Sequence, residues 1–153
     1  MPWLIAIIGP SKSGKTLLSR ECVLKIGRVA RASIKDVRDM LFNGKRVDED
    51  LVLSLVKGTA QVLLKVGYNV IFDVDPEDLV YLNEILGLGE KRALIVLGAE
   101  GKTLMSRGAT PDGVESWIWE EPEVDLDYVL ELESEVREDL DEIVEIVREI
   151  VSK

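Results

Sequence analysis

Residues 9–16 read Gly-Pro-Ser-Lys-Ser-Gly-Lys-Thr, a full match to the GxxxxGK[ST] pattern of phosphate-binding loops. Glycine at position 9 lets the chain turn sharply after the apolar run Trp3–Ile8, and glycine at position 14 lets backbone amides approach an anion with no Cβ in the way. The loop also opens a segment of helical period, so successive N–H groups and a helix N-terminus can surround a phosphate. The residues predicted to hold the phosphates of a nucleotide are Gly9, Ser11, Lys12, Ser13, Gly14, Lys15 and Thr16.

Two side chains of this loop indicate which nucleotide and which metal the loop binds. Lys15 is expected to reach the β- and γ-phosphate oxygens of ATP, and the Thr16 hydroxyl is expected to bind Mg²⁺. The sequence contains no NKxD stretch of the kind that specifies guanine. We therefore expect ATP rather than GTP.

Short apolar runs alternate along the chain with segments of helical period. The expected strands are Trp3–Ile8, Val29–Ala32, Asn69–Phe72, Ala93–Leu97 and Tyr128–Leu132. The expected helices are Lys15–Lys25, one capped by Ser33 and ending near Asn43, one capped by Asp48 and reaching Val66, one that starts at Asp75 and Pro76 and ends before Gly87, and a tail helix over Val136–Val151. Because no tight hairpin turn joins the strands, the connections should be right-handed crossovers. The pattern predicts a three-layer α/β P-loop NTPase fold with a mainly parallel five-stranded sheet.

Length and composition exclude several other classes of protein. The 153 residues are enough for one domain, taken as residues 1–153. The absence of histidine excludes Ser-His-Asp triads and HExxH metal sites, and a single cysteine, Cys22, excludes an intramolecular disulfide. The opening apolar segment lacks a basic leader, and no apolar run is long enough to span a bilayer. We expect a cytoplasmic protein that does not bind membranes.

Charge is unevenly distributed along the chain. The net charge is −10, yet residues 1–47 carry ten Lys or Arg and three acids, which gives this part +7. A basic N-terminal third can attract a polyphosphate locally, whereas ordinary exposed helix decoration would explain the same charges without a ligand. Both interpretations stay open at this point.

An acidic pair follows the third apolar run. Residues 69–75 read Asn-Val-Ile-Phe-Asp-Val-Asp, so a buried strand delivers Asp73 and then Asp75 at its carboxyl end. P-loop proteins use an acid in this place to hold magnesium, and ligands gather at the carboxyl ends of parallel strands. Asp73 is the first candidate and Asp75 the second, although Asp75 can also be read as a cap of the next helix.

Two further stretches resemble a known family. Residues 33–44 (SIKDVRDMLFNG) and 64–73 (LKVGYNVIFD) are similar to segments of the P-loop kinases of the polynucleotide 5′-hydroxyl kinase and zeta-toxin group. In that group a D-D-x-R-x-x-L segment follows the second strand, and L-x-x-G-x-x-V-I-x-D forms the third. The resemblance implies the sheet order 2-3-1-4-5 of nucleoside monophosphate kinase-like folds. A fainter pattern at residues 120–122 (EEP) resembles adenylylsulfate kinases.

The resemblance also implies roles on the acceptor side. Arg38 would grip a phosphate of the acceptor, and the general base would be the acid three residues before it. That position is Lys35 here, and the nearest acid is Asp36, about 100° further round a helix. Three readings stay open: Asp36 serves as base through a shifted turn, Asp73 or Asp75 serves instead, or the acceptor differs from that of the family.

A lid is expected within residues 101–127. Lys102–Arg107 resembles the start of such a lid, and Arg107 would be the cation that neutralises the transferring phosphoryl group. The next stretch, 108–127, contains no basic residue, which indicates a shortened or altered lid. Trp117 and Trp119 either stack on a base or pack half-buried.

Three functions follow, in order of preference. The first is ATP- and Mg²⁺-dependent phosphorylation of the 5′-hydroxyl end of DNA or RNA, with Lys15, Asp36, Arg38 and Arg107 as catalytic residues and Thr16, Asp73 and Asp75 as metal ligands. The second keeps the reaction and uses a nucleotide or another small metabolite as acceptor. The third is a regulatory module that binds a nucleotide and transfers little.

Overall fold

The strands and helices expected from the sequence are present, with small differences in extent. A computed structural model describes residues 1–98, 119–133 and 136–153. In chain order the elements are β1 (Trp3–Ile8), α1 (Lys15–Lys25), β2 (Val29–Ala32), α2 (Ile34–Phe42), α3 (Glu49–Lys65), β3 (Asn69–Val74), the 3₁₀ helix η1 (Pro76–Tyr81), α4 (Leu82–Leu86), β4 (Lys91–Leu97), β5 (Tyr128–Leu132) and α7 (Leu140–Val151).

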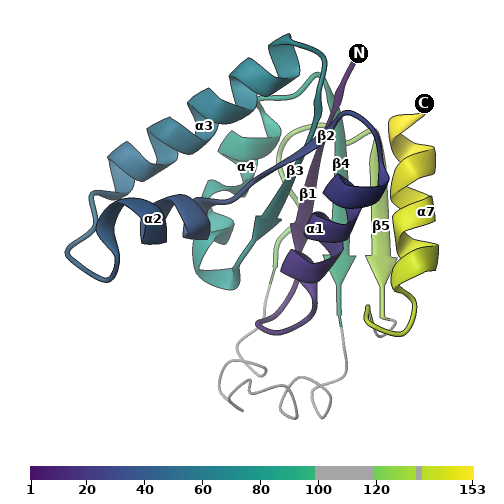
Figure 1. The fold of residues 1–153 in the computed structure, drawn as a ribbon, viewed down its shortest axis with the longest axis horizontal. Helices are drawn as coiled ribbons and strands as arrows, with labels where there is room; N and C mark the ends of the chain where they lie inside the picture. Colours follow the sequence, from purple (N-terminus) through teal and green to yellow (C-terminus); the bar gives the residue numbers. More distant parts are fainter. Residues whose placement is uncertain (99–118, 134–135) are drawn as a thin grey trace.

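The described strands form one five-stranded parallel sheet. Its order is β2-β3-β1-β4-β5, as the resemblance implied, and β1 lies in the centre (Figure 1). Ile7 of β1 pairs with Asp73 of β3, and Ile8 pairs with Val74. The phosphate-binding loop leaves β1 directly after Ile8, so the register brings Asp73 level with the start of that loop.

Helices cover both faces of the sheet. Ile5 and Ile7 pack with α1 and α7 in one core, while Leu4, Ala6 and Ile8 pack with α3 and α4 in the other. All six residues of β1 are buried, because a central parallel strand is covered on both faces. This burial explains why β1 is apolar throughout rather than alternating. The predicted three-layer α/β fold is confirmed.

Two of the predicted helix caps are present and one is not. Ser33 Oγ accepts a hydrogen bond from the Asp36 amide at 3.1 Å, and the Asp48 carboxylate accepts one from the Leu51 amide at 3.1 Å. The capping interpretation of Asp75 is wrong, because its side chain makes no cap hydrogen bond and lies 3.7 Å from Lys15 Nζ. The segment after Asp75 is also a 3₁₀ helix before it becomes α4.

The tail helix starts four residues later than expected. It begins at Leu140, whereas Val136 lies ahead of it, buried against Gly14 of the phosphate-binding loop. Cys22 packs in the core that also contains Val136, Ile5 and Ile7, as expected. None of the helices in the described ranges is both long and apolar enough to cross a membrane.

Candidate active site

The phosphate-binding loop has the backbone that its two glycines predicted. A Cβ at position 9 would lie 2.6 Å from Ser13 Oγ and 2.7 Å from the Leu97 carbonyl oxygen. Gly14 has φ of +100°, and a Cβ there would lie 2.8 Å from the Val136 Cβ. Both positions therefore require glycine, one for close approach and the other for its left-handed backbone. Ser13 Oγ is buried and has no hydrogen-bond partner.

Lys15 lies inside the curve of this loop. Its Nζ donates to the carbonyl oxygens of Gly9 at 3.0 Å and Pro10 at 2.9 Å, and only 4% of the residue is exposed. Burial lowers the pKa of the Lys15 ammonium from its ordinary value, and Asp75 and Asp73 oppose that shift. The ammonium group is thus held by two neutral carbonyl oxygens and lies 3.7 Å from the Asp75 carboxylate, at the place where a triphosphate would supply further anionic acceptors.

Thr16 and Asp73, the two residues expected to offer oxygen ligands to magnesium, are hydrogen-bonded to each other. Thr16 Oγ1 donates to Asp73 Oδ2 at 2.9 Å, although the two residues are 57 positions apart. Mg²⁺ in nucleotide sites takes one or two protein oxygens and completes its shell with phosphates and water. The described residues contain no group of three or more acids, cysteines or histidines that could hold a metal ion. Magnesium bound together with a nucleotide does not need such a group. The residues fit magnesium bound together with a nucleotide.

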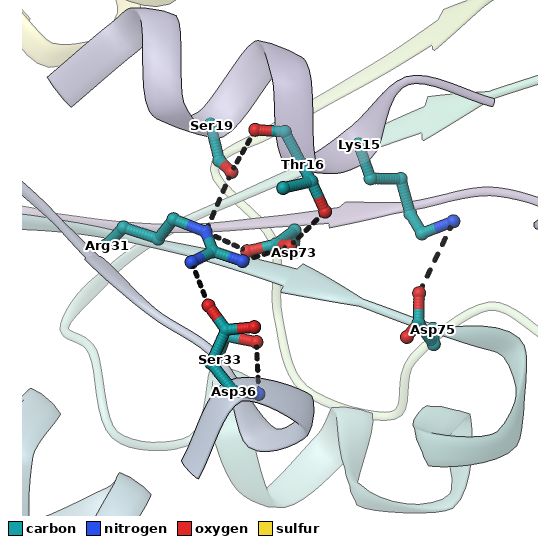
Figure 2. Close-up of polar contacts among 8 residues, drawn as sticks. All are labelled: Lys15, Thr16, Ser19, Arg31, Ser33, Asp36, Asp73 and Asp75. Atoms are coloured by element: carbon teal, nitrogen blue, oxygen red, sulfur yellow. Dashed lines mark hydrogen bonds and ion pairs between the residues drawn. The ribbon is translucent and has the colours of Figure 1, made fainter. Parts of the chain in front are cut away.

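A residue that the sequence reading missed lies beside this pair. Arg31 of β2 donates from Nε to Asp73 Oδ1 at 2.7 Å and from Nη2 to Asp73 Oδ2 at 2.8 Å (Figure 2). Its Nε also reaches Ser19 Oγ at 3.1 Å, and its Nη1 donates to Asp36 Oδ2. Burial alone would lower the pKa of Arg31, but its bonds to Asp73 and Asp36 raise the pKa above its ordinary value. In the sequence, Arg31 is one of the ten Lys or Arg residues of the basic region 1–47, and no local pattern marks it as part of a site.

The two candidate positions for an acceptor-side base lie differently. The Asp36 carboxylate faces Arg31 and is 47% exposed, so it is accessible to an incoming molecule. Lys35 lines the cavity beside the phosphate-binding loop. Of the two neighbours at the start of α2, the acid therefore joins the group around Asp73 and the lysine joins the group around Lys15.

Arg38 belongs to a separate cluster. It donates from Nη2 to Glu49 Oε2 at 2.9 Å and to Asp78 Oδ1 at 2.8 Å. Hydrogen bonds to these two acids raise the pKa of Arg38. The same cluster borders a second cavity, of about 320 Å³. The structure thus joins Arg38 to α3 and η1 rather than to the phosphate-binding loop.

A cavity of about 470 Å³ lies over the phosphate-binding loop. It is lined by Ser11, Lys12, Gly14, Lys15, Thr16, Leu17, Lys35, Asp75, Glu77 and Arg137. Four of these side chains are cationic, and Arg137 is a lining residue that the sequence reading did not select. Among the other cations of residues 1–47, Lys25, Arg31 and Arg38 are paired with acids of the protein itself.

The expected lid falls largely outside the described residues. Arg107, Trp117 and the segment Lys102–Arg107 all lie there. Trp119 is described: it is partly buried against the core that contains Leu4 and Phe72, in agreement with the packing interpretation.

Solved structures with a similar fold share only low sequence identity with this chain. No protein-family model matches the sequence, and a search of curated proteins finds no relative. A candidate kinase from Chloroflexus aurantiacus J-10-fl is similar with a TM-score of 0.70 and 20% identity, over 97% of this chain and 94% of that one. A sugar kinase from Janibacter sp. HTCC2649 is similar with a TM-score of 0.65 and 16% identity, over 99% of both chains. A chain of the Pnkp1/Rnl/Hen1 RNA repair complex is similar with a TM-score of 0.63 and 21% identity, over 74% of this chain and 41% of that one. The chain therefore has the fold of P-loop kinases.

Proposed function

We propose that the protein is an ATP- and magnesium-dependent kinase that phosphorylates the 5′-hydroxyl end of DNA or RNA. The observation that carries this proposal is the line of contacts Thr16–Asp73–Arg31–Asp36, which runs from the phosphate-binding loop to an accessible carboxylate. A kinase needs its nucleotide-binding residues and its acceptor-binding residues next to each other, because the acceptor hydroxyl must approach the γ-phosphorus in line. The likeness to a chain of an RNA repair complex and the motif at residues 33–44 favour a nucleic-acid acceptor.

Each group has a defined task in this reaction. The amides of the loop and Lys15 bind the β- and γ-phosphates, and Thr16 and Asp73 offer oxygen ligands for Mg²⁺, which would neutralise phosphate charge. The acceptor hydroxyl oxygen forms a bond to the γ-phosphorus while the bond from that phosphorus to ADP breaks. Asp36 takes the hydroxyl proton. Arg38 would bind a phosphate of the acceptor, and Arg107 would stabilise the transferring group, both by resemblance.

The test is phosphoryl transfer from γ-labelled ATP to 5′-hydroxyl DNA and RNA oligonucleotides, nucleosides and nucleotides. We expect label on an oligonucleotide, and a loss of at least about 100-fold in the Lys15→Ala variant, because its cation contacts the reacting phosphate. Lys25→Ala is the matched control, since Lys25 is a half-exposed lysine of the same helix that pairs with Glu21 and Asp141. Binding of Mg·ATP without label on any oligonucleotide would refute the proposed acceptor.

A small anionic molecule is the second candidate acceptor. The lining of the cavity over the phosphate-binding loop favours such an acceptor. Lys12, Lys35 and Arg137 border this cavity of about 470 Å³ together with Lys15. The positive charge of Lys35 and Arg137 at this cavity would attract a compact phosphate- or sulfate-bearing molecule that binds beside the ATP phosphates, without a long nucleic-acid strand. Salt dependence separates the two candidates, because an oligonucleotide that contacts the protein through several phosphates gives a steep log–log slope and a small acceptor gives a shallow one.

A further inference from the structure

Arg31 binds two carboxylates that come from different elements of the site. One edge of its guanidinium pairs with both oxygens of Asp73 in β3, and Nη1 on the other side donates to Asp36 in α2 (Figure 2). The side chain is 15% exposed, so the fork is held by its surroundings as well as by these bonds. Arg31 therefore joins the magnesium side of the site to the acceptor side through one rigid planar group.

The Asp36 carboxylate owes its position to this contact. The bond from the Asp36 amide to Ser33 Oγ fixes the backbone at the start of α2 and leaves the side chain free to rotate. The carboxylate is 47% exposed, and its bond to Arg31 turns it towards Asp73. Without that bond, solvent would compete for the carboxylate and the side chain would sample several rotamers.

We propose that Arg31 is a positioning residue, which holds Asp36 at the point where it receives the proton of the acceptor hydroxyl. The inference rests on the proposed function. It also explains how Asp36, one residue away from the position expected by resemblance, Lys35, can serve: Arg31 of β2 turns the Asp36 carboxylate towards Asp73, while Lys35 lines the cavity beside the phosphate-binding loop. The sequence shows Lys35 and Asp36, but it does not show that Arg31 pairs with Asp36.

A purely structural role for Arg31 predicts a different pattern. Arg31 also neutralises Asp73, whose side chain is 6% exposed, and that task does not involve Asp36. If neutralising Asp73 were its whole contribution, a substitution at Arg31 and one at Asp36 would act independently. If Arg31 acts through Asp36, the second substitution has nothing further to remove, so the two effects are not multiplicative.

The experiment is a double-mutant cycle on phosphoryl transfer with Arg31→Lys, Asp36→Asn and the double variant. Arg31→Lys keeps the charge that Asp73 needs and loses the fork that reaches Asp36. We expect it to lower kcat about 10- to 100-fold, the usual effect of removing a partner that orients a functional group. The KM for ATP should stay within about twofold, and the double variant should be no slower than Asp36→Asn alone.

Arg28→Lys is the matched control. Arg28 lies just before β2, binds the carbonyl oxygens of Val66 and Gly67, and stacks on Tyr68, so its substitution should leave kcat unchanged. Multiplicative effects in the cycle, or a kcat in Arg31→Lys equal to the wild-type value, would overturn the role of Arg31 while leaving the kinase proposal intact. Absence of transfer by the wild-type protein would instead refute the proposed function, and the role of Arg31 with it.

A spectroscopic measurement covers the case in which Arg31→Lys does not fold. Nitrogen-15 spectra of the Arg31 guanidinium can be compared between the wild-type protein and Asp36→Asn, which keeps the buried Arg31–Asp73 pair. We expect the Nη1 protons to exchange with water faster in Asp36→Asn, because they lose an anionic acceptor. Identical Arg31 signals in the two proteins would show that the arginine does not hold Asp36, and would overturn the proposal.

Discussion

Thr16 Oγ1 donates a hydrogen bond to Asp73 Oδ2 over 2.9 Å and so joins the first turn of α1 to the end of β3. The bond follows from strand order, because β3 lies beside β1 and their register pairs Asp73 with Ile7, two residues before Gly9. In an open parallel sheet, the carboxyl ends of neighbouring strands form the place where ligands bind. Four predictions test this site and the packing that supports it.

Asp73→Asn should weaken both the metal site and the fold. The substitution removes a magnesium ligand and leaves Arg31 without its buried bidentate partner, so we expect the free energy of unfolding to fall by about 3 kcal/mol. Urea denaturation measures this loss, and calorimetry should show that Mg²⁺ no longer strengthens ATP binding. Glu145→Gln is the control, since Glu145 is a 61% exposed member of a surface pair and should change stability by less than about 0.5 kcal/mol. Equal stability of the two variants would contradict the prediction.

Arg38→Ala should destabilise the protein even though its implied role is in binding the acceptor. Arg38 joins α2 to Glu49 of α3 and to Asp78 of η1, whose side chain is 4% exposed. Its removal leaves a buried carboxylate without its ion-pair partner, at a cost of about 2 kcal/mol. Thermal unfolding measures the effect, and Arg148→Ala, which breaks a surface pair with Glu145, is the control. A melting temperature that does not change in Arg38→Ala would show that the cluster contributes nothing to stability.

Gly14→Ala and Gly58→Ala should act in opposite directions. Alanine at position 14 requires φ of +100° and places its Cβ 2.8 Å from the Val136 Cβ, so we expect about 1–3 kcal/mol of destabilisation and weaker nucleotide binding. A Cβ at position 58, within α3, meets no atom within 4 Å, so alanine there should stabilise the helix by up to about 1 kcal/mol. Chemical denaturation of both variants checks the signs. A stabilised Gly14→Ala variant would contradict the loop geometry.

Cys22 should resist alkylation in the native protein. The thiol is fully buried, and burial together with the nearby Glu21 raises its pKa to about 12 from an ordinary value of 9.0. Near pH 8 the thiolate fraction is then about 1000-fold lower than that of an ordinary cysteine, and the thiolate is the species that reacts. Mass spectrometry after iodoacetamide treatment, with and without urea, measures the difference. Similar rates in the two conditions would contradict the burial of Cys22.

The parts of the candidate site that could be predicted are those formed by residues close together in the sequence. The sequence selects the phosphate-binding loop and the candidate pair Thr16 and Asp73, which the structure brings together, because the loop is contiguous and because an acid at the end of an apolar strand is a local pattern. The caps formed by Ser33 and Asp48 were likewise predictable, since a cap bonds an amide only three residues away. For Asp75 the same local pattern left a metal ligand and a helix cap as alternatives, because the neighbour of its carboxylate, Lys15, is distant in sequence.

The amino-acid sequence alone determined the alternation of strands and helices and the anion-binding loop, because short-range periodicity and glycine chemistry specify both. Only the tertiary structure revealed that Arg31 links Asp73 to Asp36, that Arg38 turns instead to Glu49 and Asp78, and that Val136 covers Gly14. The physical reason is that a side chain contacts whichever groups the tertiary packing brings near. Strand order and register decide the pairing of Arg31 with Asp73, and the packing of the remaining segments decides the contacts of Arg38 and Val136; neither can be read from the neighbours of a residue along the chain.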